Sequence, residues 1–322
     1  MAWYFLRAAG QAVVSLLVAS ALIFLLLRVL PGDAATVALG VNATPDALAA
    51  WRAATGTDQP LLIQYATWLT GLARLDFGVS FVTGRPISPF VLDRTQVTLI
   101  LVGLAMLIAL LVAVPLGSLA ALHRRNPLGV AITGVSQLGM AIPGFLLGLL
   151  LVALFSVNLG WLPAGGWVPP AFGFAEFLRR VTLPALTLGV IQGAVLTRYV
   201  RSAVIEQLDL DYLRTARATG LTQAQALWRH GLRNAAIPVL TVSGLQTASL
   251  LIGAVVIERV FRVPGLGSLL VDAVGNRDLL TVQGIVMVLV AIIIVVNFLT
   301  ELAYVAIDPR LRLTGGETVV TA

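Results

Sequence analysis

The stretch that decides the fold runs from Asp211 to Pro238, where a polar, basic segment lies between two strongly apolar ones. It reads Asp-Tyr-Leu-Arg-Thr-Ala-Arg-Ala-Thr-Gly-Leu over 211–221, Thr-Gln-Ala-Gln-Ala-Leu-Trp-Arg-His over 222–230 and Gly-Leu-Arg-Asn-Ala-Ala-Ile-Pro over 231–238. The flanking apolar runs are typical of membrane spans, so this segment is predicted to be a basic loop between two of them.

Local patterns in this loop predict two short helices with a break between them. Asp209 and Asp211 are expected to cap the first helix and to favour its positive N-terminal end. Gly220 is expected to end that helix in a left-handed conformation. Thr222 and Gln225 have the spacing of a capping box, which predicts the start of the second helix.

The second helix is predicted to have an apolar edge and to end at Pro238, which opens the next membrane span. The residues of this edge recur at helical spacing: Leu221, Ala224, Trp228 and Leu232. A basic amphipathic helix can also lie flat on a membrane surface, and the pattern alone leaves that alternative open.

The composition is that of a polytopic membrane protein. Of 322 residues, 58% are hydrophobic and only 11% are charged, whereas soluble domains carry about 25% charged residues. All 21 basic residues are arginine, so the chain lacks the lysine with which a P-loop reaches nucleotide phosphates. Cysteine is absent, which excludes a thiolate metal site. The net charge of +6 is attributed to loop arginines near anionic lipid rather than to nucleic-acid binding.

Long apolar runs predict an all-α protein with six transmembrane helices, each run being long enough to cross a bilayer. Pro143 predicts a kink in the third. The first exceeds the apolar core of a signal peptide and is expected to remain as a span. The six runs cover residues 8–30, 98–122, 128–155, 181–200, 239–257 and 279–307.

These runs divide the chain into four parts with one long loop. The predicted parts are an N-terminal span at 1–30, an insert at 31–95, a five-helix core at 96–307 and a tail at 308–322, and the loop covers 201–237. Arginine placement, chiefly the turn at 124–125 and the loop itself, favours both termini inside the cell and the insert outside.

The insert contains two predicted short helices. Thr44 as N-cap and Gly56 as terminator bracket the first, from Pro45 to Ala54. The second covers 61–72, and its two large aromatic residues are expected to anchor it at the membrane interface: Tyr65 and Trp68.

Two sets of residues have both a packing and a transport interpretation. Small residues at i and i+4 let helices approach closely or line a pore: Gly144, Gly148, Gly189 and Gly193. Polar residues in the fifth run form interhelical hydrogen bonds or lie along a translocation path: Gln246, Thr247 and Ser249. The sequence leaves both alternatives open, with the path hypothesis placed chiefly on Gln246 and Ser249.

Ionisable residues give no sign of an ion-coupled carrier or of an enzyme. No charge lies at the centre of a span, Glu301 being the nearest case, whereas coupled carriers usually place ionisable groups there. His123 and His230 are far apart and no ligand spacing occurs. No catalytic residue, metal site or cofactor is therefore expected in this chain.

Within the basic loop the sequence resembles a known family. Residues 212–221 followed by 230–241 are similar to the "EAA" loop of bacterial ABC importer permeases, in the version of the dipeptide, oligopeptide and nickel branch. Arg214 stands where the general consensus has Glu, and Thr219 where this branch often has Lys. Further similarity lies at 56–60, 76–78, 258–267 and 308–310, and Glu301 stands where the family commonly has Asp.

The resemblance implies a type I ABC importer permease for peptides, the first of two permease subunits. It implies as partners a second related permease, two ATP-binding subunits that hold ATP and magnesium, an extracytoplasmic substrate-binding protein and membrane lipid. Nickel chelate, glutathione or another small solute are alternative substrates, and a self-contained channel or carrier is the alternative class. ATPase coupling is assigned by the resemblance to Arg214, Thr215, Ala216, Arg217, Gly220, Leu221, Trp228, His230, Arg233 and Asn234.

Overall fold

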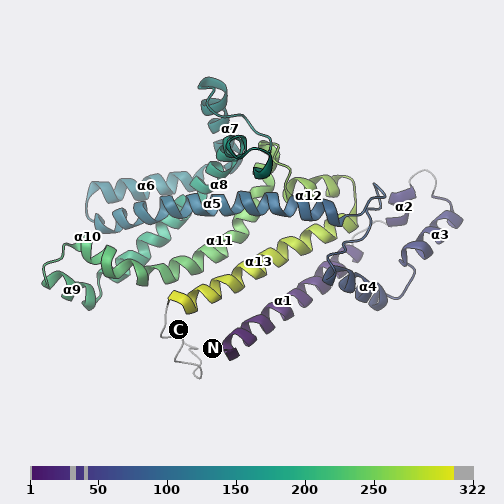
Figure 1. The fold of residues 1–322 in the computed structure, drawn as a ribbon, viewed down its shortest axis with the longest axis horizontal. Helices are drawn as coiled ribbons and strands as arrows, with labels where there is room; N and C mark the ends of the chain where they lie inside the picture. Colours follow the sequence, from purple (N-terminus) through teal and green to yellow (C-terminus); the bar gives the residue numbers. More distant parts are fainter. Residues whose placement is uncertain (1, 30–33, 40–42, 308–322) are drawn as a thin grey trace. The chain divides into compact units, whose positions relative to one another are not determined.

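The structure, a computed structural model, describes residues 2–29, 34–39 and 43–307. Within these residues the regular structure is helical, apart from one isolated β-bridge between Val79 and Pro86 (Figure 1). The chain divides into two compact units. The core unit comprises Leu99–Val263 together with the residues up to Ala9 and those from Val295 onward. The insert unit comprises Gly10–Thr98 and Pro264–Ile294.

Five of the described helices are long and apolar enough to cross a membrane. Each exceeds the length of about 20 residues that a bilayer core requires, and they confirm the predicted all-α membrane class. Some begin earlier than the apolar runs because polar turns extend them beyond the hydrophobic part. The helices are α1 (Ala2–Val29), α5 (Ser88–Leu122), α8 (Phe174–Leu208), α11 (Leu232–Val260) and α13 (Leu279–Ile307).

The third predicted span is broken rather than kinked. It consists of α6 (Pro127–Ala141), α7 (Gly144–Leu151) and the π-helix η2 (Val152–Asn158), with a bend of 100° between its two halves. Pro143 lacks an N–H and disfavours helical backbone in the residue before it, and Ile142 is accordingly extended. Counting the broken pair as one span gives six.

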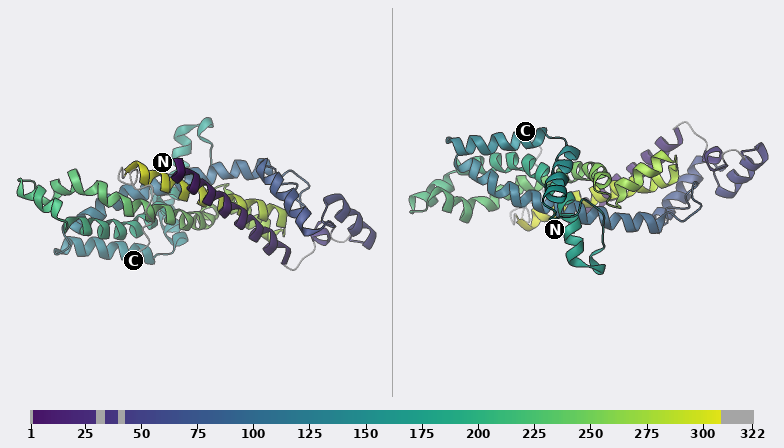
Figure 2. Two further views of the ribbon diagram at one scale, coloured as in Figure 1. Left: turned by 90° about the horizontal axis from the view of Figure 1, so that it is seen from below. Right: turned by 90° about the horizontal axis from the view of Figure 1, so that it is seen from above.

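Helix α8 is the most buried of the five membrane-length helices and packs against α6, α7 and α11 (Figures 1 and 2). Small residues allow neighbours to approach it closely. A Cβ atom added at Gly189 would lie 2.7 Å from Cβ of Ile108 in α5, and one added at Gly193 would lie 3.3 Å from Cβ of Val112. A larger side chain at either position would therefore push α5 and α8 apart.

The broken span approaches its neighbours in the same way. A Cβ atom at Gly148 would lie 3.0 Å from the ring of Phe261, and one at Gly144 would lie 3.3 Å from Cδ1 of Ile191 in α8. All four glycines of the two predicted small-residue pairs thus lie at close helix contacts within the core unit.

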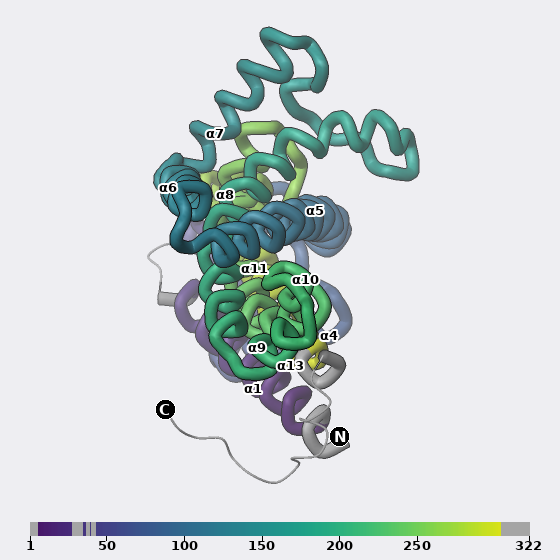
Figure 3. The backbone as a smooth tube through the Cα atoms, turned by 90° about the vertical axis from the view of Figure 1, so that its left-hand side faces the viewer, coloured from purple at the N-terminus to yellow at the C-terminus, as the bar shows by residue number. Residues whose placement is uncertain are grey.

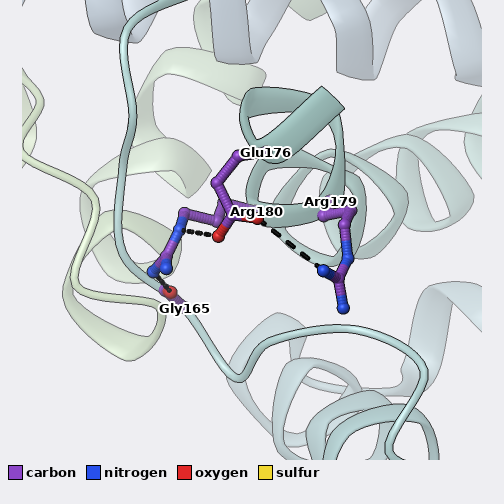
Figure 4. Close-up of polar contacts among 4 residues, drawn as sticks. All are labelled: Gly165, Glu176, Arg179 and Arg180. Carbon is purple, nitrogen blue, oxygen red and sulfur yellow. Dashed lines mark hydrogen bonds and ion pairs between the residues drawn. The ribbon is translucent and has the colours of Figure 1, made fainter. Parts of the chain in front are cut away.

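The loop between η2 and α8 is bonded to the C-terminal end of α11 and to the N-terminal part of α8. Gly166 donates its N–H to the Phe261 carbonyl just after α11 (2.7 Å), and Arg180 of α8 donates to the Gly165 carbonyl (3.1 Å). Glu176 accepts from Arg180 (2.7 Å) and lies 3.8 Å from a nitrogen of Arg179 (Figure 4). The 3-10 turn η3 (Pro170–Phe172) completes this loop.

The insert unit contains the short helices and the first part of α13. Thr44 accepts the N–H of Ala47 (3.3 Å) at the start of the first predicted helix, and Gly56 ends it with φ of +66°, which confirms both predicted boundaries to within a residue. The core of this unit gathers apolar side chains from α5, α12 and α13 around Phe77. Its shorter helices are α2 (Ala34–Leu39), α3 (Pro45–Thr55), α4 (Leu61–Ala73) and α12 (Leu266–Gly275).

The two aromatic residues of α4 that were predicted to anchor it at the membrane interface have contacts within the protein. Tyr65 and Trp68 pack with Phe24 of α1, at ring-centre distances of 5.4 and 5.9 Å, and the Tyr65 hydroxyl lies 2.8 Å from that of Ser20; their position at the interface stays a prediction.

The prediction for Pro238 in the core unit is wrong. Pro238 lies inside α11 and does not end a helix. A membrane helix tolerates the loss of the one backbone hydrogen bond that proline removes, because neighbouring groups can donate a hydrogen bond to the freed carbonyl oxygen. The predicted tail at 308–322 lies outside the described residues.

Candidate functional site

The basic loop begins where α8 ends, and an ion pair fixes that point. Asp209 was predicted to cap the following helix, but it ends α8 and pairs with Arg124 of the α5–α6 turn at 2.9 Å. The hydrogen bond from Arg124 lowers the pKa of Asp209 below its usual value, and the same bond raises the pKa of Arg124. This ion pair connects the α5–α6 turn to the end of α8 at the protein surface.

The first helix of the loop is α9 (Asp211–Ala218), whose N-cap is Leu210. Asp211 lies in its first turn, where a negative charge complements the helix dipole, and pairs with Arg214 at 3.0 Å. Leu213 is fully buried against the core and Ala216 is half-buried beside it, whereas the other residues of α9 are exposed.

Gly220 provides the turn after α9, as predicted. Its φ is +99°, its N–H donates to the Arg217 carbonyl (3.0 Å), and the N–H of Leu221 reaches back to the Ala216 carbonyl (3.4 Å). These two bonds form a Schellman motif, which satisfies carbonyls that a helix end leaves unpaired. A residue with a Cβ is strained at this φ.

The predicted capping box follows at once. The N–H of Gln225 donates to the Thr222 hydroxyl (3.3 Å), and the N–H of Thr222 donates to the Gln225 side-chain oxygen (3.0 Å). The box starts α10 (Gln223–Ala226), which continues through the π-helix η4 (Leu227–Gly231) into α11 without a break. Figure 3 shows α9 and α10 as adjacent short helices.

The predicted apolar edge of the second helix is partly wrong. Leu221 and Leu232 are half-buried against the core, but Ala224 is exposed and Trp228 is 57% exposed. Leu227 is fully buried instead. The wider π turn contains one residue more than an α-helical turn, so it changes which side chains face inward.

The loop therefore presents a polar surface that is held in place by capped helix ends, buried leucines and side-chain hydrogen bonds. Tyr212 donates its hydroxyl to the Gln207 side chain (2.8 Å) and accepts from Asn234 (3.2 Å), which links α9 to α8 and to α11. Among the other residues assigned to coupling, Thr215 is exposed and bonds the Asp211 carbonyl, and Ala216 is half-buried. The remaining exposed ones are Arg214, Arg217, Gly220, Trp228, His230 and Arg233.

Sequence reasoning missed the residues that hold this surface in place, namely Tyr212, Leu213 and Leu227. Leu213 and Leu227 come from different helices and meet in one cluster with the end of α8. Their spacing gave no sign of that meeting, because the turn at Gly220 lies between them.

The polar residues predicted along the translocation path face different surroundings. Thr247 is buried and bonds the Ser243 carbonyl (3.0 Å), whereas Ser249 is exposed and donates to Gln246 (3.4 Å). Ser249 also lines a cavity of about 250 Å³ between α7, α8 and α11. Gln192 lines the same cavity and was not predicted. Its buried Nε2 has no hydrogen-bond partner.

The described part of the chain was predicted to hold no metal site, and its acidic and histidine residues are dispersed. Residues 2–29, 34–39 and 43–307 contain no group of three His, Cys, Asp or Glu that could hold a metal ion.

Comparisons with known proteins agree with this architecture. Residues 113–313 match the family described as "Binding-protein-dependent transport system inner membrane component", and residues 1–102 match the model of its N-terminal region. A peptide transport system permease from Brucella abortus (strain 2308) is 39% identical over 307 residues, covering 95% of this chain and 98% of that protein. The glutathione transport system permease GsiC of Salmonella typhi is 39% identical over 310 residues, covering 96% and 98%.

A solved structure supports the fold independently. The crystal structure of an amino acid ABC transporter with histidines superimposes with a TM-score of 0.50 at 17% identity, covering 68% of this chain and 94% of that one. Because family models cover most of the sequence and relatives align along nearly all of it, this protein belongs to the binding-protein-dependent transport family, as an inner-membrane permease component of an ABC importer.

Proposed function

We propose that this permease imports peptides and that residues 211–233 couple it to separate ATPase subunits. The observation that carries the proposal is the rigid mounting of α9 and α10. Leu213 and Leu227 are buried, two capping motifs fix the turn, and Arg214, Arg217 and Trp228 are exposed. A short, stiff element of this kind passes on rigid-body motion that a flexible loop would absorb.

The substrate class rests on the relatives. One is named for peptide transport and another for glutathione, which is itself a tripeptide, so short peptides cover both names. The proposed partners are a second permease subunit, two ATP-binding subunits carrying ATP and magnesium, and an extracytoplasmic binding protein. For the path itself, the cavity beside Ser249 and Gln192 supports a route near the broken helix pair.

Reconstitution tests this proposal. The complete importer in liposomes is expected to accumulate labelled tri-alanine or glutathione inside the vesicles only when ATP and magnesium reach the ATPase subunits. The matched control replaces ATP with a non-hydrolysable analogue. Equal uptake by this chain alone, down a gradient and without ATP, would instead identify a self-contained channel or carrier.

The proposed orientation places both termini in the cytoplasm and the insert outside. The chain has no cysteine, so single cysteines report their side of the membrane specifically. Asp58 in the insert and Ala224 in α10 are both exposed. In intact cells, Asp58→Cys is expected to react with a membrane-impermeant maleimide and Ala224→Cys to react only after permeabilisation. The reverse pattern contradicts the orientation.

A further inference from the structure

A pocket of about 270 Å³ lies in the core unit between α6 and α8, two helices that pack against each other (Figure 1). One side of α6 forms most of its wall, where Val130, Gly134 and Gln137 recur at helical spacing. Arg124 of the α5–α6 turn and Arg201 of α8 complete the lining. We call this the α6–α8 pocket.

Three arginines give this region its charge. Arg124 and Arg201 line the α6–α8 pocket, and Arg198 lines a narrow pocket of about 20 Å³ that also includes Arg201. No described residue that lines either pocket is acidic. Within the described part of the chain, the ion pairs between side chains do not include Arg198 or Arg201.

The carboxylate of Asp209 neutralises only part of this charge. It accepts two hydrogen bonds from the Arg124 guanidinium (3.1 and 2.9 Å), and a guanidinium has five N–H donors. The side chain of Arg201 is half-buried, where its charge is less screened by solvent than at an open surface. The region therefore keeps a positive charge and attracts an anion.

The uncharged polar groups of the pocket add a second requirement. The Thr133 hydroxyl donates its hydrogen to the Gly129 carbonyl (2.7 Å), so its oxygen can only accept a further hydrogen bond. The Gln137 side chain is exposed and has both a donor and an acceptor. A phosphate accepts from guanidinium and amide groups, and a hydroxyl beside it donates to Thr133. A phosphoglycerol group combines the two.

The position of the pocket indicates where such a group comes from. Helix α8 and the pair of α6 and α7 are long and apolar enough to span a membrane. Next to the pocket, α6 exposes large apolar side chains, Leu128 by 51%, Val135 by 67% and Leu138 by 68%. Acyl chains cover such side chains in a bilayer, and basic pockets between transmembrane helices bind lipid head groups.

We propose that the α6–α8 pocket binds the phosphoglycerol head group of an anionic membrane phospholipid. Arg124 and Arg201 hold the phosphate, Thr133 accepts from a glycerol hydroxyl, and the acyl chains lie along the exposed apolar side of α6. A zwitterionic lipid with an ethanolamine head group fits poorly, because its ammonium group would lie beside the arginines. The assignment is independent of the proposed substrate and of the proposed coupling.

Lipid binding to the complete importer in detergent tests the proposal, with dioleoyl phosphatidylglycerol as the probe and native mass spectrometry as the measurement. Arg201→Gln is expected to weaken binding about fivefold, the contribution of one arginine near an anionic lipid. Gly134→Leu is expected to weaken it as much by filling the pocket. A Cβ at Gly134 meets nothing within 4 Å, and leucine favours a helix over glycine, so this variant should fold.

Arg125→Gln is the matched control. Arg125 is exposed in the same turn as Arg124 but lines neither pocket, and its replacement removes the same charge. It should leave phosphatidylglycerol binding unchanged. Equal losses in Arg125→Gln and Arg201→Gln would mean that the lipid is attracted by diffuse surface charge, and the proposal would be wrong. Unchanged binding in both Arg201→Gln and Gly134→Leu would also overturn it.

Two further probes identify the head group and its source. Dioleoyl phosphatidylethanolamine, with the same acyl chains, should bind roughly tenfold more weakly, and equal binding contradicts the head-group assignment. Glycerol phosphate has the head group without acyl chains and should not displace the lipid at millimolar concentration. Displacement would assign the pocket to a soluble phosphate ester instead of a lipid. The peptide import assay is separate, since its failure leaves these binding results unchanged.

Discussion

Gly220→Val is expected to lower ATP-dependent uptake at least tenfold. The variant complex is expected either to hydrolyse ATP without transport or to lose its ATPase subunits. Gly220 has φ of +99°, where a β-branched residue is strongly strained, by roughly 1–2 kcal/mol or more. A Cβ there would meet nothing within 4 Å, so the strain comes from the backbone alone. The chain relieves it by changing the turn, which rotates α10 relative to α9.

The measurement combines uptake, substrate-stimulated hydrolysis and co-purification of the ATPase subunits in the reconstituted complex. Gly160→Val is the matched control, because Gly160 also has a positive φ (+64°) and open space around it but lies in the α7–α8 loop. It should keep coupling intact. If Gly220→Val retained both stimulated hydrolysis and uptake, residues 211–233 would be an ordinary surface loop.

The turn between α9 and α10 was predictable because its causes are local. The Schellman motif and the capping box each involve residues within five positions of one another, and glycine, threonine and glutamine have known preferences at those positions. The membrane class and the position of the bend at Pro143 were predictable for the same reason, since apolar length and a missing N–H act on the segment that contains them. The size of the bend was not, because a kink was predicted and the two halves meet at 100°.

The orientation of side chains around that turn was not predictable from spacing. The π turn at 227–231 begins at Leu227, which is buried in one cluster with Leu213 and the end of α8, and that contact is tertiary. A register counted at 3.6 residues per turn placed Trp228 inside and was therefore wrong. The ion pair of Asp209 with Arg124 likewise depends on a turn 85 residues away.

Gly165→Ala is expected to destabilise the protein by roughly 3 kcal/mol or more, because the added methyl group overlaps backbone atoms that cannot move independently. Its Cβ would lie 2.1 Å from the carbonyl oxygen of Phe261 and 2.8 Å from the carbonyl carbon. Relieving this overlap moves the loop away from α11 and weakens the bonds of Gly166 to Phe261 and of Arg180 to Gly165 (Figure 4).

Thermal unfolding in detergent checks this, with an expected fall in apparent Tm of several degrees, roughly 2–4 °C per kcal/mol. Gly103→Ala in α5 is the matched control, because a Cβ there meets nothing within 4 Å and alanine favours helix over glycine by about 1 kcal/mol. It should be neutral or stabilising. An unchanged Tm for Gly165→Ala would mean that the loop after η2 is not held against Phe261, and that the end of α11 is fixed by the contact of Gly148 with the Phe261 ring instead.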